Sequence, residues 1–572
     1  MNALNRNTAA FRGWLARHKL SFVGFLLGFA QITLPFPSLF ITNRYLSRPQ
    51  PAPCVRPAGV SVHLAPPPVS IEPLVTAHLA APARVSYDRV VLPGDFPDPT
   101  ITKVGDTYWA SATSAEWGAV FPLFTSKNLL DWELVGHVFP DRLPDWAGSN
   151  FWAPEFYQEH GRTYVYYTAR QKGGGLCVAV ASADHPAGPY TDHGPLVGQA
   201  AGSIDGFAMP DEHGDLYLIW KEDGNSCHQD TPIWAQRLND ARTALVGEAT
   251  ELFGNDAKWE GPLVEGSALV RHDGWFYMFY AGNACCGKSC SYATGAARAR
   301  ALLGPWEKYA HNPVLDRNAT WKCPGHGTVT ELNGRWFLLH HAYAAESHEF
   351  VGRQGLLSEF TWNAEGWPEF AHRSPQAAPL ADVARFNVAD EFVGDRLGLE
   401  WQWPIGAPPA TTVRGRQLHL AAGASRLGNL VARRTHVATY KAATTLNFAH
   451  LPAGTFAGLA AVGDPYNALA LMAGNGQVQI WHVKSGKQQC LAHAFIEPCD
   501  TLTLRLEVWG GQRYRFAYST DGATWQPLPT ENFSLNGTYL PPWDRGVRVA
   551  LLAQGPENSA ATFHNFILRN QR

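Results

Sequence analysis

Charged residues and metal-binding cysteine motifs are scarce in this sequence. Only 17% of its 572 residues are charged, and 46 Lys and Arg against 49 Asp and Glu give a net charge of −3. Without a basic block, the chain lacks the electrostatic footprint of a nucleic-acid-binding protein. Its nine cysteines show no paired C-x2-C spacing of the zinc type, and no glycine-rich phosphate-binding loop is present.

Aromatic residues, glycine and proline are abundant instead. The chain has 21 Trp, 19 Tyr and 29 Phe, together with 53 Gly and 41 Pro. This composition predicts many turns and few long helices, and it offers flat apolar faces that suit sugar rings. The length exceeds what one hydrophobic core can organise, so we expect two or three domains.

The first 48 residues have the pattern of an export segment. Four Lys and Arg residues precede an uncharged, mostly apolar run from Leu20 to Asn43 that is long enough to span a bilayer. An uncleaved signal anchor is the favoured interpretation, and a cleaved signal peptide is the alternative. Both predict that the rest of the chain is exported to the periplasm or the exterior, with residues 20–43 as its only contact with a membrane.

A proline-rich tether is predicted for residues 49–85, because eight of the 25 residues from 49 to 73 are proline. In an exported chain, cysteines favour disulfides over zinc binding. Cys490 and Cys499 flank a short segment and could close it.

One motif recurs five times within residues 86–373. A glycine is followed by a short, aromatic-rich β run at spacings of 53 to 60 residues, beginning at Gly105, Gly161, Gly214, Gly274 and Gly334. Each unit reads as a small antiparallel sheet that cannot bury both faces alone. Five such sheets packed radially make a five-bladed β-propeller.

Five further residues stand 7 to 9 positions before these glycines, namely Asp98, Trp152, Asp205, Glu265 and His326. Equivalent positions in a rotationally repeated structure face the same place. We therefore expect three carboxylates, one Trp and one His to converge on the central channel.

Two opposed carboxyl groups can cleave a glycosidic bond, with one acting as general acid and the other as general base. We assign Glu265 as the acid, Asp98 as the base and Asp205 as the pKa modulator that also positions the sugar. Glu260 is the competing candidate for the acid, but it lies 14 residues from Gly274, whereas Glu265 lies nine away.

Six segments carry a resemblance to a known family: LPGDFPDPTI (92–101), WAPE (152–155), SIDGFAMPDEHGDLYLIW (203–220), VEGSALVRHDGWFYMFY (264–280), PGHGTV (324–329) and GRQGLLSEFTWNAEGWP (352–368). In this order they resemble glycoside hydrolase family 43. The resemblance implies a five-bladed propeller and an inverting mechanism with Asp98, Asp205 and Glu265 in the roles given above. The family usually shows EGP or EAP at the acid, and here Glu265 is followed by Gly-Ser.

The resemblance also bears on substrate binding. His326 resembles a His that lies near a channel cation in some members, so calcium is a candidate there although no cofactor is required. The alternative for His326 is a hydrogen-bonded core residue. Arg353 resembles an Arg that contacts the sugar and the modulator carboxylate, with a solvated strand end as the alternative. Trp152 is either a sugar platform or blade core, and Trp117 is expected at the pocket rim.

Residues 386–572 have a different pattern, with alternating runs such as LTLRLEV (502–508) and VRVALLA (547–553). These runs predict half-buried strands of a two-sheet β-sandwich. The region resembles the concanavalin-A-like C-terminal domain of family 43 β-xylosidases. We expect it to pack against the propeller and complete the pocket, and the alternative is a detachable carbohydrate-binding module.

These observations together predict an exported inverting glycosidase that acts on an oligo- or polysaccharide of the plant hemicellulose type. A β-xylosidase and an α-L-arabinofuranosidase are equally compatible with the sequence. A non-catalytic, lectin-like propeller is the alternative from another class.

Overall fold

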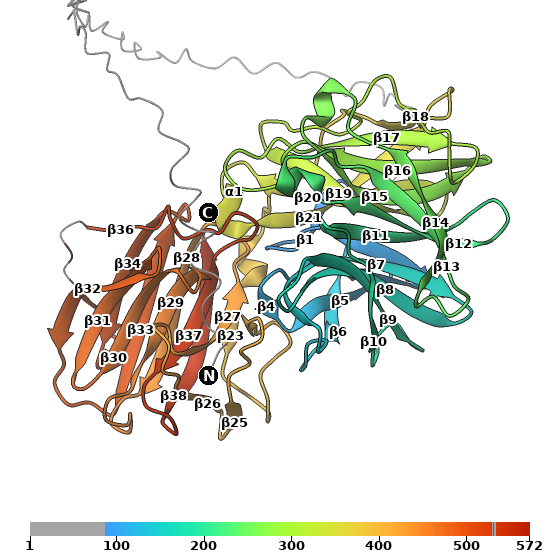
Figure 1. The fold of residues 1–572 in the computed structure, drawn as a ribbon. Helices are drawn as coiled ribbons and strands as arrows, with labels where there is room; N and C mark the ends of the chain where they lie inside the picture. Colours follow the sequence, from blue (N-terminus) through green and yellow to red (C-terminus); the bar gives the residue numbers. More distant parts are fainter. Residues whose placement is uncertain (1–85, 529, 531–532, 572) are drawn as a thin grey trace, which may run out of the picture. The chain divides into compact units, whose positions relative to one another are not determined.

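The computed structural model describes residues 86–528, 530 and 533–571, which are almost entirely β (Figure 1). The predicted export segment and tether, residues 1–85, lie outside the described residues. Within the described part of the chain, no helix is long and apolar enough to cross a membrane. The helices are single short turns: η1 (Gly224–Cys227), η2 (Lys258–Glu260), α1 (His348–Val351) and η3 (Val383–Phe386).

Five antiparallel sheets form the blades of a propeller, as predicted. The first contains β2 (Thr100–Val104), β3 (Thr107–Ser111), β5 (Val120–Ser126) and β6 (Glu133–Phe139). The second contains β7 (Ala147–Glu159), β8 (Arg162–Gln171), β9 (Leu176–Ala183) and β10 (Thr191–Val197). The third contains β11 (Ser203–Pro210), β12 (Leu216–Glu222), β13 (Ile233–Leu238) and β14 (Leu245–Phe253). The fourth contains β15 (Val264–His272), β16 (Trp275–Gly282), β17 (Ala293–Ala299) and β18 (Glu307–Lys308).

The fifth blade closes the ring with a strand from the other end of the propeller. It contains β19 (Trp321–Leu332), β20 (Arg335–Ala344), β21 (Arg353–Trp362), β22 (Pro368–Phe370) and β1 (Arg89–Leu92). Strand β1 pairs antiparallel with β21, so the first strand of the described chain is built into the last blade. This pairing links residues far apart in sequence, which the repeat pattern did not predict.

Each blade buries its faces against its two neighbours. Between the second and third blades, for example, Tyr164 and Val178 pack with Leu218 and Trp220 in one buried cluster. Equivalent clusters fill the other four interfaces, including the one between the fifth blade and the first. The strands that follow the repeated glycines contribute buried residues to all five clusters, and this buried apolar surface stabilises the ring.

The five repeated glycines form the turns between the first two strands of the blades. All five have φ between 62° and 92°, in the left-handed region that favours glycine. At four of them a β-carbon would meet nothing within 4 Å, so backbone conformation rather than space requires glycine there.

The C-terminal region is a two-sheet sandwich, as predicted. One sheet contains β23 (Val388–Asp390), β25 (Thr411–Arg414), β26 (Gln417–Ala421), β28 (Thr439–Asn447), β33 (Thr501–Trp509), β34 (Arg513–Ser519), β35 (Gln526–Pro527), β36 (Leu535–Asn536) and β38 (Ala560–Gln571). The other contains β27 (Asn429–Arg434), β29 (Phe456–Asp464), β30 (Asn467–Gly474), β31 (Gln477–Lys484), β32 (Lys487–Phe495) and β37 (Arg548–Gln554). A separate two-stranded ladder joins β4 (Trp117–Gly118) to β24 (Trp403–Pro404).

The central strands β29, β30 and β37 of the second sheet are buried on both faces. One face contributes Leu459 and Leu551 to the sandwich core, and the other contributes Leu430 and Leu552 to a cluster that includes Trp117 of the propeller. The prediction of a half-buried strand is therefore wrong for β37, whose residues are buried along almost its whole length. On its outer face, Ala550 and Leu552 belong to the buried cluster that contains Trp117 of the propeller.

Two disulfides are present among the described cysteines, Cys285–Cys286 and Cys290–Cys323. The Cys490–Cys499 bridge that the sequence left possible does not form, because both cysteines are free. Cys490 lies on β32, where its thiol is directed to the carbonyl oxygen of Ala492 at 3.4 Å.

A buried ion pair joins the propeller to the sandwich. Asp95 accepts hydrogen bonds from Nη2 of Arg548 (2.9 Å) and from the backbone N–H of Gly546 (3.0 Å). Its other carboxylate oxygen accepts the backbone N–H of Arg353 (3.2 Å), and its carbonyl oxygen accepts Nε of Arg434 (2.9 Å). The Asp95 and Arg548 side chains are each only 2% exposed.

Removing one member of a buried pair leaves an uncompensated charge. We expect Asp95→Ala to lower the free energy of unfolding by about 3 to 5 kcal/mol, measured by urea denaturation followed through tryptophan fluorescence. Asp106→Ala is the control, because Asp106 pairs with Lys127 on an open surface and its loss should leave the urea midpoint unchanged. Equal midpoints for Asp95→Ala and the unmodified protein would contradict this account.

Candidate active site

Each blade has a backbone irregularity within its first strand or just before it. One residue there has a left-handed φ: Asp98 (51°), Ala153 (42°), Asp205 (58°), Gly266 (64°) and His326 (29°). In the second to fifth blades the register of the ladder shifts at the same place. Bulges of this kind redirect side chains out of the regular strand alternation, and Asp98, Asp205, Glu265 and His326 all lie at or next to these positions.

Asp98 is a buried carboxylate held by several donors. Its Oδ1 lies 3.1 Å from Nη1 of Arg353 and 3.2 Å from Nδ1 of His341, and its Oδ2 accepts the Thr113 hydroxyl at 2.7 Å. Burial alone would raise the pKa of Asp98, but Arg353, His341 and the nearby His326 lower it far below its ordinary value. Asp98 is therefore ionised at neutral pH.

Asp205 lies beside Asp98 and is linked to it through His326. Nδ1 of His326 is 3.6 Å from Oδ1 of Asp98 and 3.9 Å from Oδ2 of Asp205. The same Asp205 oxygen accepts the backbone N–H of Gly266 at 3.0 Å. Burial and the neighbouring carboxylates of Glu265 and Asp98 raise the pKa of Asp205 to about 6, although His326 opposes this.

Glu265 faces the same group and has two direct partners. Its Oε1 accepts the Tyr292 hydroxyl at 2.9 Å, and its Oε2 accepts Nζ of Lys221 at 2.7 Å. The Tyr292 ring stacks on His341 at 5.8 Å, which connects Glu265 to the surroundings of Asp98. The structure thus brings Asp98, Asp205 and Glu265 together.

Glu260, the competing candidate for the acid, has a different environment. Its carboxylate accepts the hydroxyl of Tyr280 (2.7 Å), the backbone N–H of Ala257 (2.9 Å) and Nζ of Lys308 (2.8 Å to Oε1). Glu260 is fully buried and is the last residue of η2, which precedes the first strand of the fourth blade. Its partners do not include the other predicted carboxylates.

Two of the predicted substrate-binding residues, Trp152 and Arg353, contact residues of the sandwich. Trp152 is half-buried, and its ring is perpendicular to that of Trp543 at 6.1 Å. Trp543 belongs to the sandwich and is 60% exposed. Arg353 is buried rather than a solvated strand end, and it contacts the base candidate Asp98 rather than Asp205. Its Nη2 donates to the carbonyl oxygen of Asp544, the residue after Trp543.

Trp117 is not at a pocket rim, contrary to the sequence-based expectation. It is 2% exposed and packs against Leu430 and Leu552 of the sandwich. Its strand β4 is paired with β24, which fixes it in the contact between the two domains. An exposed tryptophan of the sandwich, Trp543, stands beside Trp152 instead.

Several polar residues of the site carried no predicted role. Glu155, in the WAPE segment, is buried, and its two carboxylate oxygens accept the hydroxyls of Thr100 (2.7 Å) and Thr328 (2.9 Å). Burial raises its pKa to about 7, although both threonine hydroxyls lower it. Lys221 and Tyr292 were missed because they lie outside the repeated positions, on β12 and before β17. Glu155 could have been flagged as an acidic residue inside a buried β run.

A cation site near His326 is not supported by the side chains present. Among the described residues, no group of three or more His, Cys, Asp and Glu side chains could hold a metal ion. The imidazole of His326 instead lies within 4 Å of two carboxylates.

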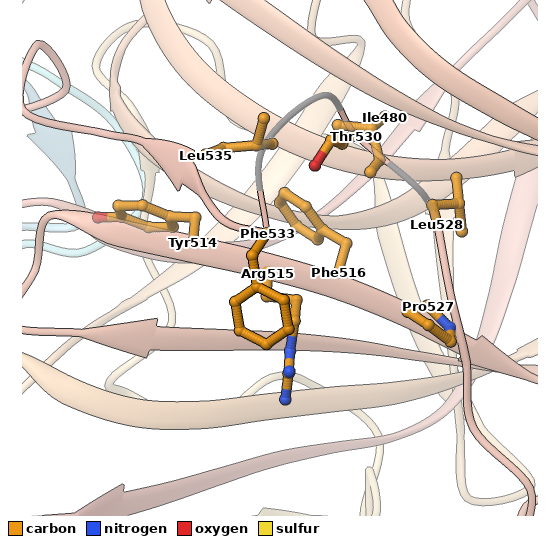
Figure 2. Close-up of a pocket in the computed structure, with 9 residues that line it drawn as sticks. All are labelled: Ile480, Tyr514, Arg515, Phe516, Pro527, Leu528, Thr530, Phe533 and Leu535. Atoms are coloured by element: carbon orange, nitrogen blue, oxygen red, sulfur yellow. The ribbon is translucent and has the colours of Figure 1, made fainter.

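A pocket of about 240 Å³ in the sandwich has a different character (Figure 2). Its lining is chiefly apolar, with Tyr514, Phe516 and Leu528 around the cavity and Arg515 beside Phe533. None of the nine described residues that line it is acidic. It therefore lacks the carboxyl groups that glycosidic bond cleavage needs.

Comparisons with known proteins agree with the geometry of the propeller. Residues 87–368 match glycosyl hydrolases family 43, and residues 389–569 match the beta xylosidase C-terminal Concanavalin A-like domain. The chain belongs to glycoside hydrolase family 43. It is therefore a glycosidase, and the lectin-like alternative is set aside.

Relatives of this family 43 chain include a xylosidase/arabinosidase of Butyrivibrio fibrisolvens, 28% identical over 326 residues that make up 54% of this chain and 60% of that protein. A xylan 1,3-β-xylosidase of a Vibrio species is 24% identical over 79% of this chain and 91% of its own length. The crystal structure of the family 43 protein BlXynB from Bacillus licheniformis superposes with a TM-score of 0.70 at 23% identity, covering 84% of this chain and 99% of that one. At this identity the superposition supports the fold alone.

The raised pKa of Glu155 makes stability depend on pH. Because its pKa in the folded protein is about 7 against an ordinary value of 4.5, its contribution to stability is complete at low pH and is lost as the pH rises through 7. Glu155→Gln cannot ionise, so we expect a smaller fall in Tm between pH 5 and pH 8.5 than in the unmodified enzyme. Thermal unfolding by circular dichroism would show this. Identical pH dependence of the two proteins would contradict the assignment.

Proposed function

We propose that this family 43 enzyme is an inverting glycosidase that removes pentose units from hemicellulose-type oligo- or polysaccharides. The observation that carries the proposal is the buried group in which Asp98, held ionised by Arg353, and Glu265 both lie around Asp205. A carboxylate and a second carboxyl group around one space are what hydrolysis with inversion requires.

In the proposed reaction, Asp98 accepts a proton from a water molecule whose oxygen attacks the anomeric carbon. The bond between that carbon and the leaving oxygen breaks, and Glu265 gives its proton to the leaving oxygen. Solvent then restores both protonation states. Arg353 and Thr113 hold the Asp98 carboxylate in place, and Asp205 and His326 stand between the two reacting groups.

The pentose specificity is proposed from the relatives, whose names include xylosidase, arabinosidase and xylan 1,3-β-xylosidase. The sandwich is proposed to complete the pocket. Trp543 beside Trp152, and the bond from Arg353 to the Asp544 carbonyl, support this role over that of a detachable binding module.

Export of the enzyme is also a proposal. The sequence pattern of residues 1–48 supports it, as do the two disulfides of the described chain, because disulfides persist in oxidising compartments. A membrane anchor at residues 20–43 is part of the same proposal.

The assignment of the acid can be tested with two matched substitutions. Glu265→Gln should lower kcat by ~10² to 10⁴ on substrates with poor leaving groups, because a positioned general acid contributes about this much. Glu260→Gln removes a carboxylate of the same blade that lies among other partners, and it should have a far smaller effect. Steady-state kinetics on nitrophenyl glycosides and on a pentose disaccharide would measure both. A larger loss in Glu260→Gln would reverse the assignment.

The stereochemical outcome is a separate expectation. Inversion at the anomeric carbon follows if a water molecule fits between Asp98 and the sugar, which needs carboxyl groups ~6.5 to 9.5 Å apart. Proton NMR of the sugar released first, recorded before mutarotation, should show the opposite anomeric configuration to the substrate. Retained configuration would instead require a covalent intermediate on one of the carboxylates.

A further inference from the structure

A lysine is buried against the proposed general acid. Lys221 lies on β12, and its side chain is only 1% exposed. Its Nζ donates to Oε2 of Glu265 (2.7 Å), to Oδ1 of Asp223 (2.9 Å) and to Oδ1 of Asn225 (2.6 Å). All three ammonium hydrogens therefore have acceptors, and two of the three acceptors are carboxylates.

Such a group stays charged only if its partners compensate for the lost hydration. Burial lowers the pKa of Lys221, but the carboxylates of Glu265 and Asp223 outweigh this effect and raise the pKa above its ordinary value. Lys221 is therefore an ammonium ion under working conditions.

The surroundings contain charge of both signs. The ionisable groups that face Glu265 come from four blades and from the segments beside them: Lys221, Asp223, Tyr292, Asp205, Asp98 and His326. Lys221 is the group among them that gives Glu265 a direct ion pair. Asp223 is the counter-ion on the far side of that ammonium.

The pairing suits a carboxyl group that gains and loses a proton in each turnover. While Glu265 is protonated, Lys221 and Asp223 form a neutral pair. Once Glu265 has given up its proton, the same ammonium lies between two carboxylates, 2.7 and 2.9 Å away. Neither state leaves a buried charge without a partner, which would otherwise be costly.

We propose that Lys221 is a positioning residue that stabilises the carboxylate formed when Glu265 protonates the leaving oxygen. We also propose that Asp223, by attracting the same ammonium, weakens this stabilisation. This inference rests on the proposed function. An ammonium ion 2.7 Å from Glu265 stabilises the negative charge that forms on this carboxyl group when its proton leaves. Asp223 attracts the same ammonium from 2.9 Å and opposes this effect.

Two substitutions should therefore shift the alkaline limb of the pH profile in opposite directions. Lys221→Met removes the positive charge, so the alkaline limb of kcat/KM should move to higher pH by about one unit or more. Asp223→Asn keeps the shape of the side chain and makes Glu265 the one carboxylate paired with Lys221. The alkaline limb of kcat/KM should therefore move to lower pH. The measurement is kcat/KM from pH 4 to 9 on nitrophenyl xyloside or arabinofuranoside, whichever the unmodified enzyme hydrolyses.

The leaving group provides a second readout. Lys221→Met should lose on the order of tenfold or more in kcat on a pentose disaccharide, whose leaving alcohol needs a proton, and much less on the nitrophenyl glycoside. A lysine that merely stabilised the fold would lower both rates equally and would leave the pH limb in place.

Lys308→Met is the matched control, because Lys308 also pairs with a buried glutamate of the fourth blade, Glu260, but is not among the groups that face Glu265. Its pH profile should equal that of the unmodified enzyme. Unmoved limbs in Lys221→Met and Asp223→Asn, or movement in the same direction, would overturn the inference. If Lys221→Met does not fold, the test rests on Asp223→Asn alone. If the alkaline limb of Asp223→Asn then fails to move to lower pH, the inference is overturned.

Failure of the proposed function has a different signature. It would appear as full activity in Glu265→Gln, whatever the limbs of the other variants do. An inactive Glu265→Gln together with unmoved limbs would leave the proposed function in place and reject only the role of Lys221.

Discussion

The cost of burying charge organises this structure more than any other constraint. Asp98, Asp205, Glu265 and Glu155 all lie where water is largely excluded, and each must find donors or change its protonation state. They do so differently. Asp98 is held ionised by Arg353, whereas the Glu155 carboxylate accepts two threonine hydroxyls and burial raises its pKa to about 7. One ring of blades therefore produces carboxyl groups with different chemical roles.

The propeller supplies the geometry for this division. Its apolar runs close five interfaces into a ring, and β1 completes the last blade by pairing with β21. Within or just before each first strand, one residue adopts a left-handed φ, and in the second to fifth blades the ladder register shifts there. The regular strands provide rigidity, and the irregular positions provide the convergence of functional groups.

The sandwich takes part in the same electrostatic arrangement. The Asp95 side chain pairs with Arg548, while the Asp544 carbonyl accepts Arg353, which also contacts Asp98. A residue of the C-terminal domain thus lies one hydrogen bond from a partner of the proposed base. Burial of both faces of β37 adds apolar contact to these polar links.

The sequence by itself determined the five-bladed architecture and the residues that meet in it. Five glycines at regular spacing, each followed by an aromatic-rich strand, specify local structure, and equal phase places Asp98, Asp205, Glu265 and His326 at equivalent points. Local periodicity is visible in one chain because each repeat carries its own turn and its own apolar face.

Only the tertiary structure decided which groups become partners. Lys221 and Glu265 are 44 positions apart in the sequence, and Arg353 and Asp98 are 255 positions apart. No local sequence pattern therefore indicates either contact. Trp117 shows the same limit, because its type and position suggested a pocket rim, whereas a second domain covers it. Burial and charge pairing depend on which surfaces the folded chain brings together, and that information is not local to any segment.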